Sequence, residues 1–116
     1  MQRRATKQSR GPNAEEKRFQ SWLKQQPCAV GGWGITEVHH CKGSTFKHNK
    51  VHIGHWFCLP LSQSAHSAYH AGTKAWQAQY GNQAEIWERV YMAYKIDTDC
   101  DPCPDDVYDS IMSLWR

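Results

Sequence analysis

Ile35-Thr-Glu-Val-His-His40 is the stretch from which the fold can be read. Its β-branched residues alternate with polar ones, which is typical of a half-buried strand. Trp56-Phe-Cys-Leu59, closed by Pro60, predicts a second short strand, and Gly31-Gly-Trp-Gly34 predicts a turn before the first. Together they predict a β-hairpin, with a tip or loop that carries Lys42, Lys47 and Lys50.

Helical patterns lie on both sides of this hairpin. Apolar residues recur at helical spacing, and Asn13, Gly72 and Gly81 supply start or stop signals. A loop rich in Asp, Pro and Cys is expected at 97–106. The order of helix, hairpin, short helix and further helices predicts a small α+β domain in which helices surround the hairpin core. The expected helices cover residues 14–25, 62–71, 74–80, 82–96 and 107–115.

The chain has 116 residues, enough for one domain and too few for two independent cores. We expect residues 13–116 to form that domain, with its core at about 27–96, and residues 1–12 to be a basic, mobile arm. The formal charge is +5 over residues 1–24 and −5 over residues 97–116. A basic arm favours a polyanion, although a merely solvated terminus fits equally well, and the acidic end predicts that only one face is basic.

Composition excludes several classes of protein. No apolar run approaches the roughly 18 residues of a membrane-spanning helix, and no apolar segment follows the basic start as it would in a secretory signal. Five cysteines, an odd number, disfavour a disulfide framework. We therefore expect a cytoplasmic protein without a membrane partner, with reduced thiols or thiolates on a metal.

All seven histidines lie within residues 39–70. His66 and His70 are four apart, so both face one side of the predicted helix and can meet one ion. Adjacent strand residues point to opposite faces, so only one of His39 and His40 can join them. His39, His66 and His70 therefore predict a metal site with open positions, and His40 remains as a general base. The alternative is a set of satisfied core histidines, which this pattern disfavours.

Three motifs carry a family resemblance. Glu37-Val-His39-His40, a strand ending Leu59-Pro60-Leu61, and His66-x-x-x-His70 resemble the HNH group of ββα-metal (His-Me finger) nucleases over about residues 27–96. Trp76-Gln-Ala-Gln-Tyr80-Gly81 and the long helix after it are similar to a narrower branch, the phage recombination-enhancement nucleases. That branch acts on DNA with a strand-exchange recombinase, which implies location in a bacterial host cell and a recombinase filament as a partner.

The resemblance implies a metal-dependent DNA endonuclease that hydrolyses phosphodiester bonds. His40 would deprotonate the attacking water, and His39, His66 and His70 would hold Zn²⁺, Mn²⁺ or Mg²⁺, of which imidazoles suit the first two better. Many relatives carry an Asn or Asp between the histidine pair and the helix, which supports the base or the metal. Here the nearest candidate, counting back from Pro60, is His55, and Asn49 lies further off. Glu37 is expected to accept the other N–H of His39, or else to be an exposed carboxylate. The expected phosphate contacts are Arg3, Arg4, Lys7, Arg10, Lys42, Lys47 and Lys50.

The cysteines and tryptophans leave alternatives open. Cys100-Asp-Pro-Cys103 is half of a structural zinc site, which another cysteine would have to complete, and two free thiols fit as well. Many relatives carry Cys-x-x-Cys before the histidine pair, where this chain has only Cys28. A non-catalytic, zinc-stabilised module that binds nucleic acid or acts as an accessory is therefore the alternative function. Trp33 and Trp56 are expected to pack into the core rather than stack on a base.

Overall fold

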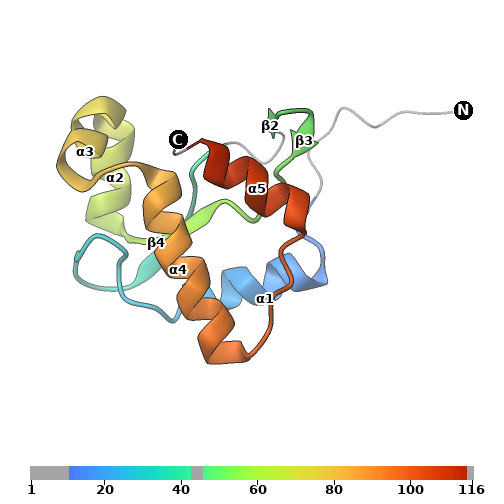
Figure 1. Ribbon diagram of the computed structural model, residues 1–116. Coiled ribbons are helices and arrows are strands. Elements are labelled where there is room, and N and C mark those ends of the chain that lie inside the picture. The colour runs from blue at the N-terminus through green and yellow to red at the C-terminus, as the bar shows by residue number, and fades with distance from the viewer. Residues whose placement is uncertain (1–10, 43–45, 115–116) are drawn as a thin grey trace, which may run out of the picture.

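The computed structural model describes residues 11–42 and 46–114 and has an α+β fold, as predicted (Figure 1). Arg3, Arg4, Lys7 and Arg10 of the expected arm lie outside the described residues. The elements in chain order are α1 (Ala14–Leu23), β1 (Thr36–His40), β2 (Lys47–His48), β3 (Val51–His52), β4 (Cys58–Ser62), α2 (Gln63–Ala71), α3 (Thr73–Tyr80), α4 (Gln83–Thr98) and α5 (Asp105–Ser113).

Local capping sets the helix starts. The side chain of Asn13 accepts the N–H of Glu16 at 2.8 Å, and Glu16 accepts the N–H of Asn13 at 2.9 Å, which forms a capping box at α1. Ser62 caps α2, and Asn82 caps α4. Other helix boundaries differ from the prediction by two residues. Helix α4 continues to Thr98 rather than 96, and α5 runs from Asp105 to Ser113 rather than from 107 to 115.

The central sheet consists of β1 and β4, which pair antiparallel with His39 opposite Leu59 and Val38 opposite Pro60. The predicted end of the second strand at Pro60 is wrong, because β4 continues through this residue. Cys41 donates its N–H to Phe57 O, so the alternating ladder makes Val38 and Pro60 a pair without hydrogen bonds. The missing N–H of Pro60 would point away from β1, so the ladder loses nothing.

A second hairpin, β2 and β3, forms where the sequence predicted only a tip or loop. Asn49 and Lys50 both have positive φ, at 54° and 67°, as expected for the turn that best fits a two-residue hairpin. The hairpin packs on α5: Asn49 Nδ2 donates to Ser113 Oγ, and Ser110 Oγ donates to His48 O. The acidic helix α5 thus lies next to the lysine-bearing hairpin (Figure 1) rather than on a separate face.

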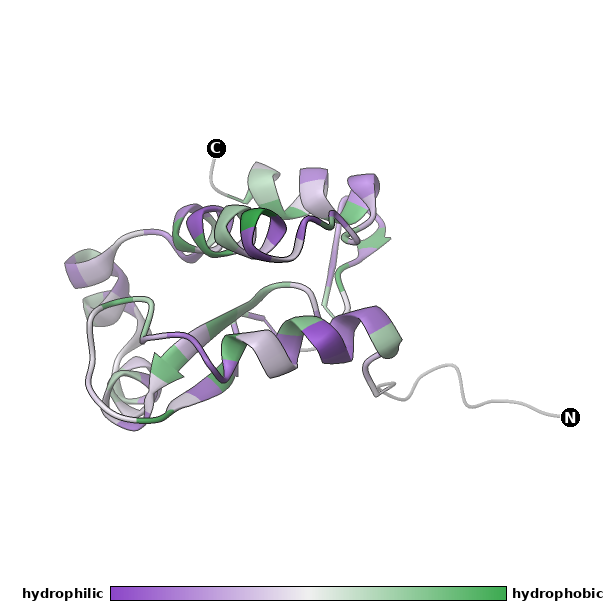
Figure 2. Cartoon of the chain, turned by 90° about the horizontal axis from the view of Figure 1, so that it is seen from below, coloured by the Kyte–Doolittle hydropathy of each residue, from purple (hydrophilic) through white to green (hydrophobic). Residues whose placement is uncertain are grey.

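An aromatic core joins the helices to the sheet. Trp87 and Tyr91 of α4 are fully buried and stack with ring centroids 5.1 Å apart, and Trp87 Nε1 donates to Trp56 O at 2.7 Å. The ring centroids of Phe19 in α1 and Tyr94 in α4 lie 4.9 Å apart. Figure 2 shows α4 and α5 together in a layer above the sheet and α1.

The two tryptophans near the sheet have different surroundings. Trp56 is buried, as predicted, whereas Trp33 is 93% exposed, so the prediction that Trp33 packs in the core is wrong. The reason is its position on the turn before β1 begins, where its side chain points away from the core. In the described residues, no helix is both long and apolar enough to cross a bilayer.

Candidate metal centre

β1 and α2 bring the three predicted ligands together. α2 begins directly after β4, whose Ser62 pairs with Thr36, so its first turn lies beside the start of β1. His39, His66 and His70 each offer a nitrogen, and these nitrogens all lie within 4.8 Å of one another. Nitrogens on a tetrahedral zinc ion lie about 3.3 Å apart, so small side-chain movements would close the site.

A hydrogen bond fixes the tautomer of His39. Its Nε2 lies 2.8 Å from Oε1 of Gln83, the first residue of α4, and a carbonyl oxygen can only accept. Nε2 therefore carries the proton, and Nδ1 presents a lone pair. His39 Nδ1 is buried and has no hydrogen-bond partner within residues 11–42 and 46–114. A buried lone pair without a partner is costly, and a cation bound there would satisfy it.

His66 is oriented in the same way by Glu37. Nδ1 of His66 lies 2.8 Å from Oε1 of Glu37, so this nitrogen donates, and in the neutral ring the lone pair is on Nε2. The prediction that Glu37 supports His39 is wrong, since the carboxylate pairs with His66 instead. The reason is direction: Nε2 of His39 points to α4, while Glu37 stands half exposed beside the first turn of α2.

The environment keeps His39 in the form that binds metals. Burial, together with the smaller effect of the neighbouring His66 and His70, lowers the pKa of His39 to about 4, although the bond to Gln83 opposes the shift. The imidazole is therefore neutral at physiological pH, and neutral imidazole is the ligand form. Within the described part of the chain no Cys, Asp or Glu joins the three histidines. Three donors fit an open, catalytic ion better than a closed structural one.

His40 follows His39 on β1 and lies half buried on the opposite face of the strand. Its Nε2 lies 3.0 Å from Nδ1 of His55, and the backbone N–H of His55 donates to Oε2 of Glu16 at 2.9 Å. If His40 is to act as a base, Nε2 must donate to His55, which leaves the lone pair on Nδ1 of His40. Burial and the nearby His55 lower the pKa of His40, and Glu16 opposes the shift. The structure thus pairs His40 with His55.

With this geometry in place, comparison with known proteins adds a family. The sequence matches the model of a family described as "protein of unknown function (DUF968)" over residues 4–97. The chain belongs to this DUF968 family. The uncharacterized protein YdfU of Escherichia coli strain K12 is 31% identical over 71 residues, which make up 61% of this chain and 20% of that protein. The chain thus spans about a fifth of the length of that relative. No solved structure gave a significant match.

The part of this DUF968 chain that matches its family contains the three candidate ligands, the pair of His40 and His55, and the two orienting residues Glu37 and Gln83. Cys100 and Cys103 lie beyond it. The structure does not bring them into a zinc site: Cys100 is exposed, Cys103 is buried, and no group of three ligands in the described residues includes either. Burial also raises the pKa of the Cys103 thiol, which disfavours the thiolate that a metal requires.

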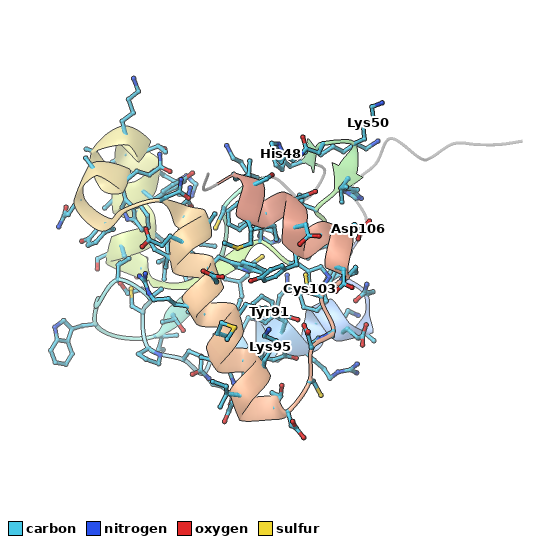
Figure 3. All side chains as sticks on the ribbon, in the orientation of Figure 1. His48, Lys50, Tyr91, Lys95, Cys103 and Asp106 are labelled. Carbon is cyan, nitrogen blue, oxygen red and sulfur yellow. The ribbon has the colours of Figure 1, made fainter. Side chains whose placement is uncertain are left out.

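The predicted phosphate-binding lysines are exposed. Lys47 belongs to β2, Lys50 to the turn after it, and Lys42 precedes the hairpin with its Nζ 5.5 Å from the centre of the Phe46 ring. Figure 3 shows Lys50 at the outer end of the hairpin, with its side chain directed away from the helices. These side chains can reach a ligand without rearrangement of the core.

Sequence reasoning missed Gln83 and Tyr69. Gln83 is buried beside His39 and also donates Nε2 to Tyr69 Oη at 3.4 Å, and the ring of Tyr69 meets that of His39 at 4.4 Å. Helical spacing could have placed Tyr69 near the site, since it lies three residues after His66 and so shares its side of α2. No feature of the sequence pointed to Gln83, because a glutamine in the first turn of a helix is normally solvated.

Proposed function

We propose that this protein is a metal-dependent DNA endonuclease of the HNH type. The observation that carries the proposal is the convergence of three imidazoles, two of them with lone pairs set by Gln83 and Glu37, next to a fourth imidazole held apart by His55. A histidine cluster with a purely structural role would not require a buried ring nitrogen without a hydrogen-bond partner. Nor would it require hydrogen-bond acceptors on the ring nitrogens that face away from the cluster.

In the proposed reaction, His40 Nδ1 takes a proton from a water whose oxygen attacks phosphorus. The bond from phosphorus to the 3′-oxygen breaks, and the leaving 3′-oxygen takes a proton from solvent water to become a hydroxyl. His55 accepts the hydrogen bond from Nε2 of His40 and so keeps Nδ1 deprotonated and aimed. A Zn²⁺, Mn²⁺ or Mg²⁺ ion held by His39, His66 and His70 would stabilise the negative charge that develops on the phosphate oxygens. Lys42, Lys47 and Lys50 bind neighbouring phosphates without reading sequence.

Plasmid nicking tests the base. Wild-type protein loaded with zinc or manganese should nick supercoiled plasmid, and EDTA should stop it. His40→Ala should slow nicking by about 10²- to 10⁴-fold, the usual contribution of a general base, while metal affinity stays within about threefold because His40 is not among the three donors. His48→Ala is the matched control, since this histidine lies on β2 away from the centre.

A His40→Ala protein that still nicks at the wild-type rate would contradict the assignment of the base. X-ray absorption on the zinc-loaded protein separates the alternative function, a non-catalytic zinc module. A shell of three nitrogens and water supports the enzyme, whereas four protein ligands including sulfur, with no nicking, would support the module. Assays with and without a recombinase filament test whether the enzyme acts in phage recombination.

A further inference from the structure

We propose that Trp33 is a stacking platform for an unpaired base of a DNA strand bound at the metal centre; this inference rests on the proposed function. Trp33 is 93% exposed and Ile35 is 87% exposed, and they are the two most exposed large apolar side chains in the described residues. A tryptophan of this kind normally buries most of its surface. Both ring faces are therefore available to a planar ligand.

The turn that carries Trp33 is anchored to the sheet. Ala29 donates its N–H to Pro60 O at 2.8 Å, and Gly31 donates its N–H to Cys28 O at 3.1 Å. A Cβ on Gly32 would collide with the Ser62 hydroxyl, so the backbone lies directly against the end of β4. Gly31 and Gly34, on either side, have φ of 86° and 93°, which other residues rarely adopt. The chain thus holds this exposed ring on a defined backbone.

The same turn leads directly into the metal centre. Trp33 is four residues before Glu37, so their Cα atoms are at most about 14 Å apart. Glu37 in turn contacts His66, one of the three ligands, at 2.8 Å. A strand whose phosphate lies at the centre would need only a few nucleotides to reach Trp33.

A nucleobase fits this surface better than a protein partner does. The apolar area comprises two side chains bordered by exposed Gly31, Gly34 and Glu37, which is too small for the apolar centre of a stable protein interface. One exposed flat ring is the arrangement that stacks on bases of any sequence. Bases inside a duplex are already stacked, so the substrate class is single-stranded DNA, or DNA with an unpaired nucleotide close to the cut.

Binding of labelled single-stranded oligonucleotides tests the platform. Measured by fluorescence anisotropy in a zinc-loaded His40→Ala background, Trp33→Ala should weaken binding about 5- to 150-fold, the range for loss of one stacked base. The slope of affinity against salt should not change, because no phosphate contact is lost. Trp33→Phe should recover most of the affinity. Ile96→Ala, which removes another exposed apolar side chain at the far end of α4, should have no effect.

An abasic scan locates the base. Removing one base at a time from the oligonucleotide should weaken binding at one position near the bound phosphate, and Trp33→Ala should abolish that position effect. Equal binding by Trp33→Ala and its parent, or a parent that binds no single strand, would overturn the platform. Nicking of plasmid by the wild-type protein would still support the nuclease in either case. A dimer that Trp33→Ala converts to monomer, seen by light scattering, would overturn the platform in favour of a protein contact.

Discussion

Replacement of Gln83 by leucine should weaken metal binding although Gln83 is not a ligand. Gln83 Oε1 is the acceptor, at 2.8 Å, for the N–H of His39 Nε2, and both residues are buried. Without this acceptor the proton gains nothing by staying on Nε2. The imidazole can then place its proton on Nδ1, the nitrogen that has no partner and that the ion needs.

The expected magnitude follows from what the bond does. Loss of a partner that orients a ligating histidine typically costs 10- to 100-fold in metal affinity, or about 1.4–2.7 kcal/mol. The metal-free protein also loses a buried hydrogen bond, which costs about 1–3 kcal/mol when the donor is left unpaired. Leucine regains part of that loss through apolar burial, so the effect on affinity should exceed the effect on stability.

Competition with a chromophoric chelator measures zinc affinity, and urea unfolding in EDTA measures stability. Gln79→Leu is the matched control, because this glutamine lies exposed on α3 and should leave both quantities unchanged. Unchanged zinc affinity in a folded Gln83→Leu protein would show that the proton on His39 is not set by Gln83. It would also remove the argument that the centre is built for a cation.

Further predictions concern the sheet and core. Burial raises the pKa of the Cys58 thiol, so the unfolded chain releases this proton first, and above about pH 8.5 this one thiol should lower the free energy of unfolding by up to roughly 1.4 kcal/mol per pH unit. Cys58→Ala should lack this component in urea unfolding under reducing conditions. Pro60→Ala should lower the free energy of unfolding by about 2–3 kcal/mol, because it removes two buried methylene groups and frees the unfolded chain without gaining a ladder bond, and a gain in stability would contradict the assigned register. Trp87→Ala should cost about 3–5 kcal/mol by the same measurement, because it empties the core and frees Trp56 O.

Features set by neighbours in the sequence were predicted correctly. The predicted helix starts at residues 14 and 82 lie within one residue of those of α1 and α4, because the caps at Asn13 and Asn82 involve residues at most three apart. The pairing of His66 with His70 is of the same kind, because both lie on one helix one turn apart. These signals fixed the start of α1 and α4 and two of the three candidate ligands.

Features that depend on direction in three dimensions were predicted less well. Pro60 ends a strand only where its missing N–H would face the partner strand, and the register of β1 with β4 turns it away. Trp33 and Trp56 are the same residue type near the same sheet, yet one is exposed and the other is covered by α1 and α4. Composition and spacing carry no information about which of the two tryptophans the helices will cover.

The candidate metal centre also combines features that the sequence predicts with features that depend on the three-dimensional arrangement. The order and spacing of residues in the sequence are enough to identify the candidate ligands. The tautomers that leave a lone pair for a cation, in contrast, are set by residues from other elements. Gln83 is 44 positions from His39 and reaches it only because α4 packs over the sheet, and Glu37 serves α2 rather than its own strand. A histidine motif transferred to a fold without these two acceptors would keep its spacing and lose its tautomers. The proposed binding of a cation therefore depends on the packing of β1, α2 and α4 together, and variants at Gln83 and Glu37 test it more sharply than removal of the histidines does.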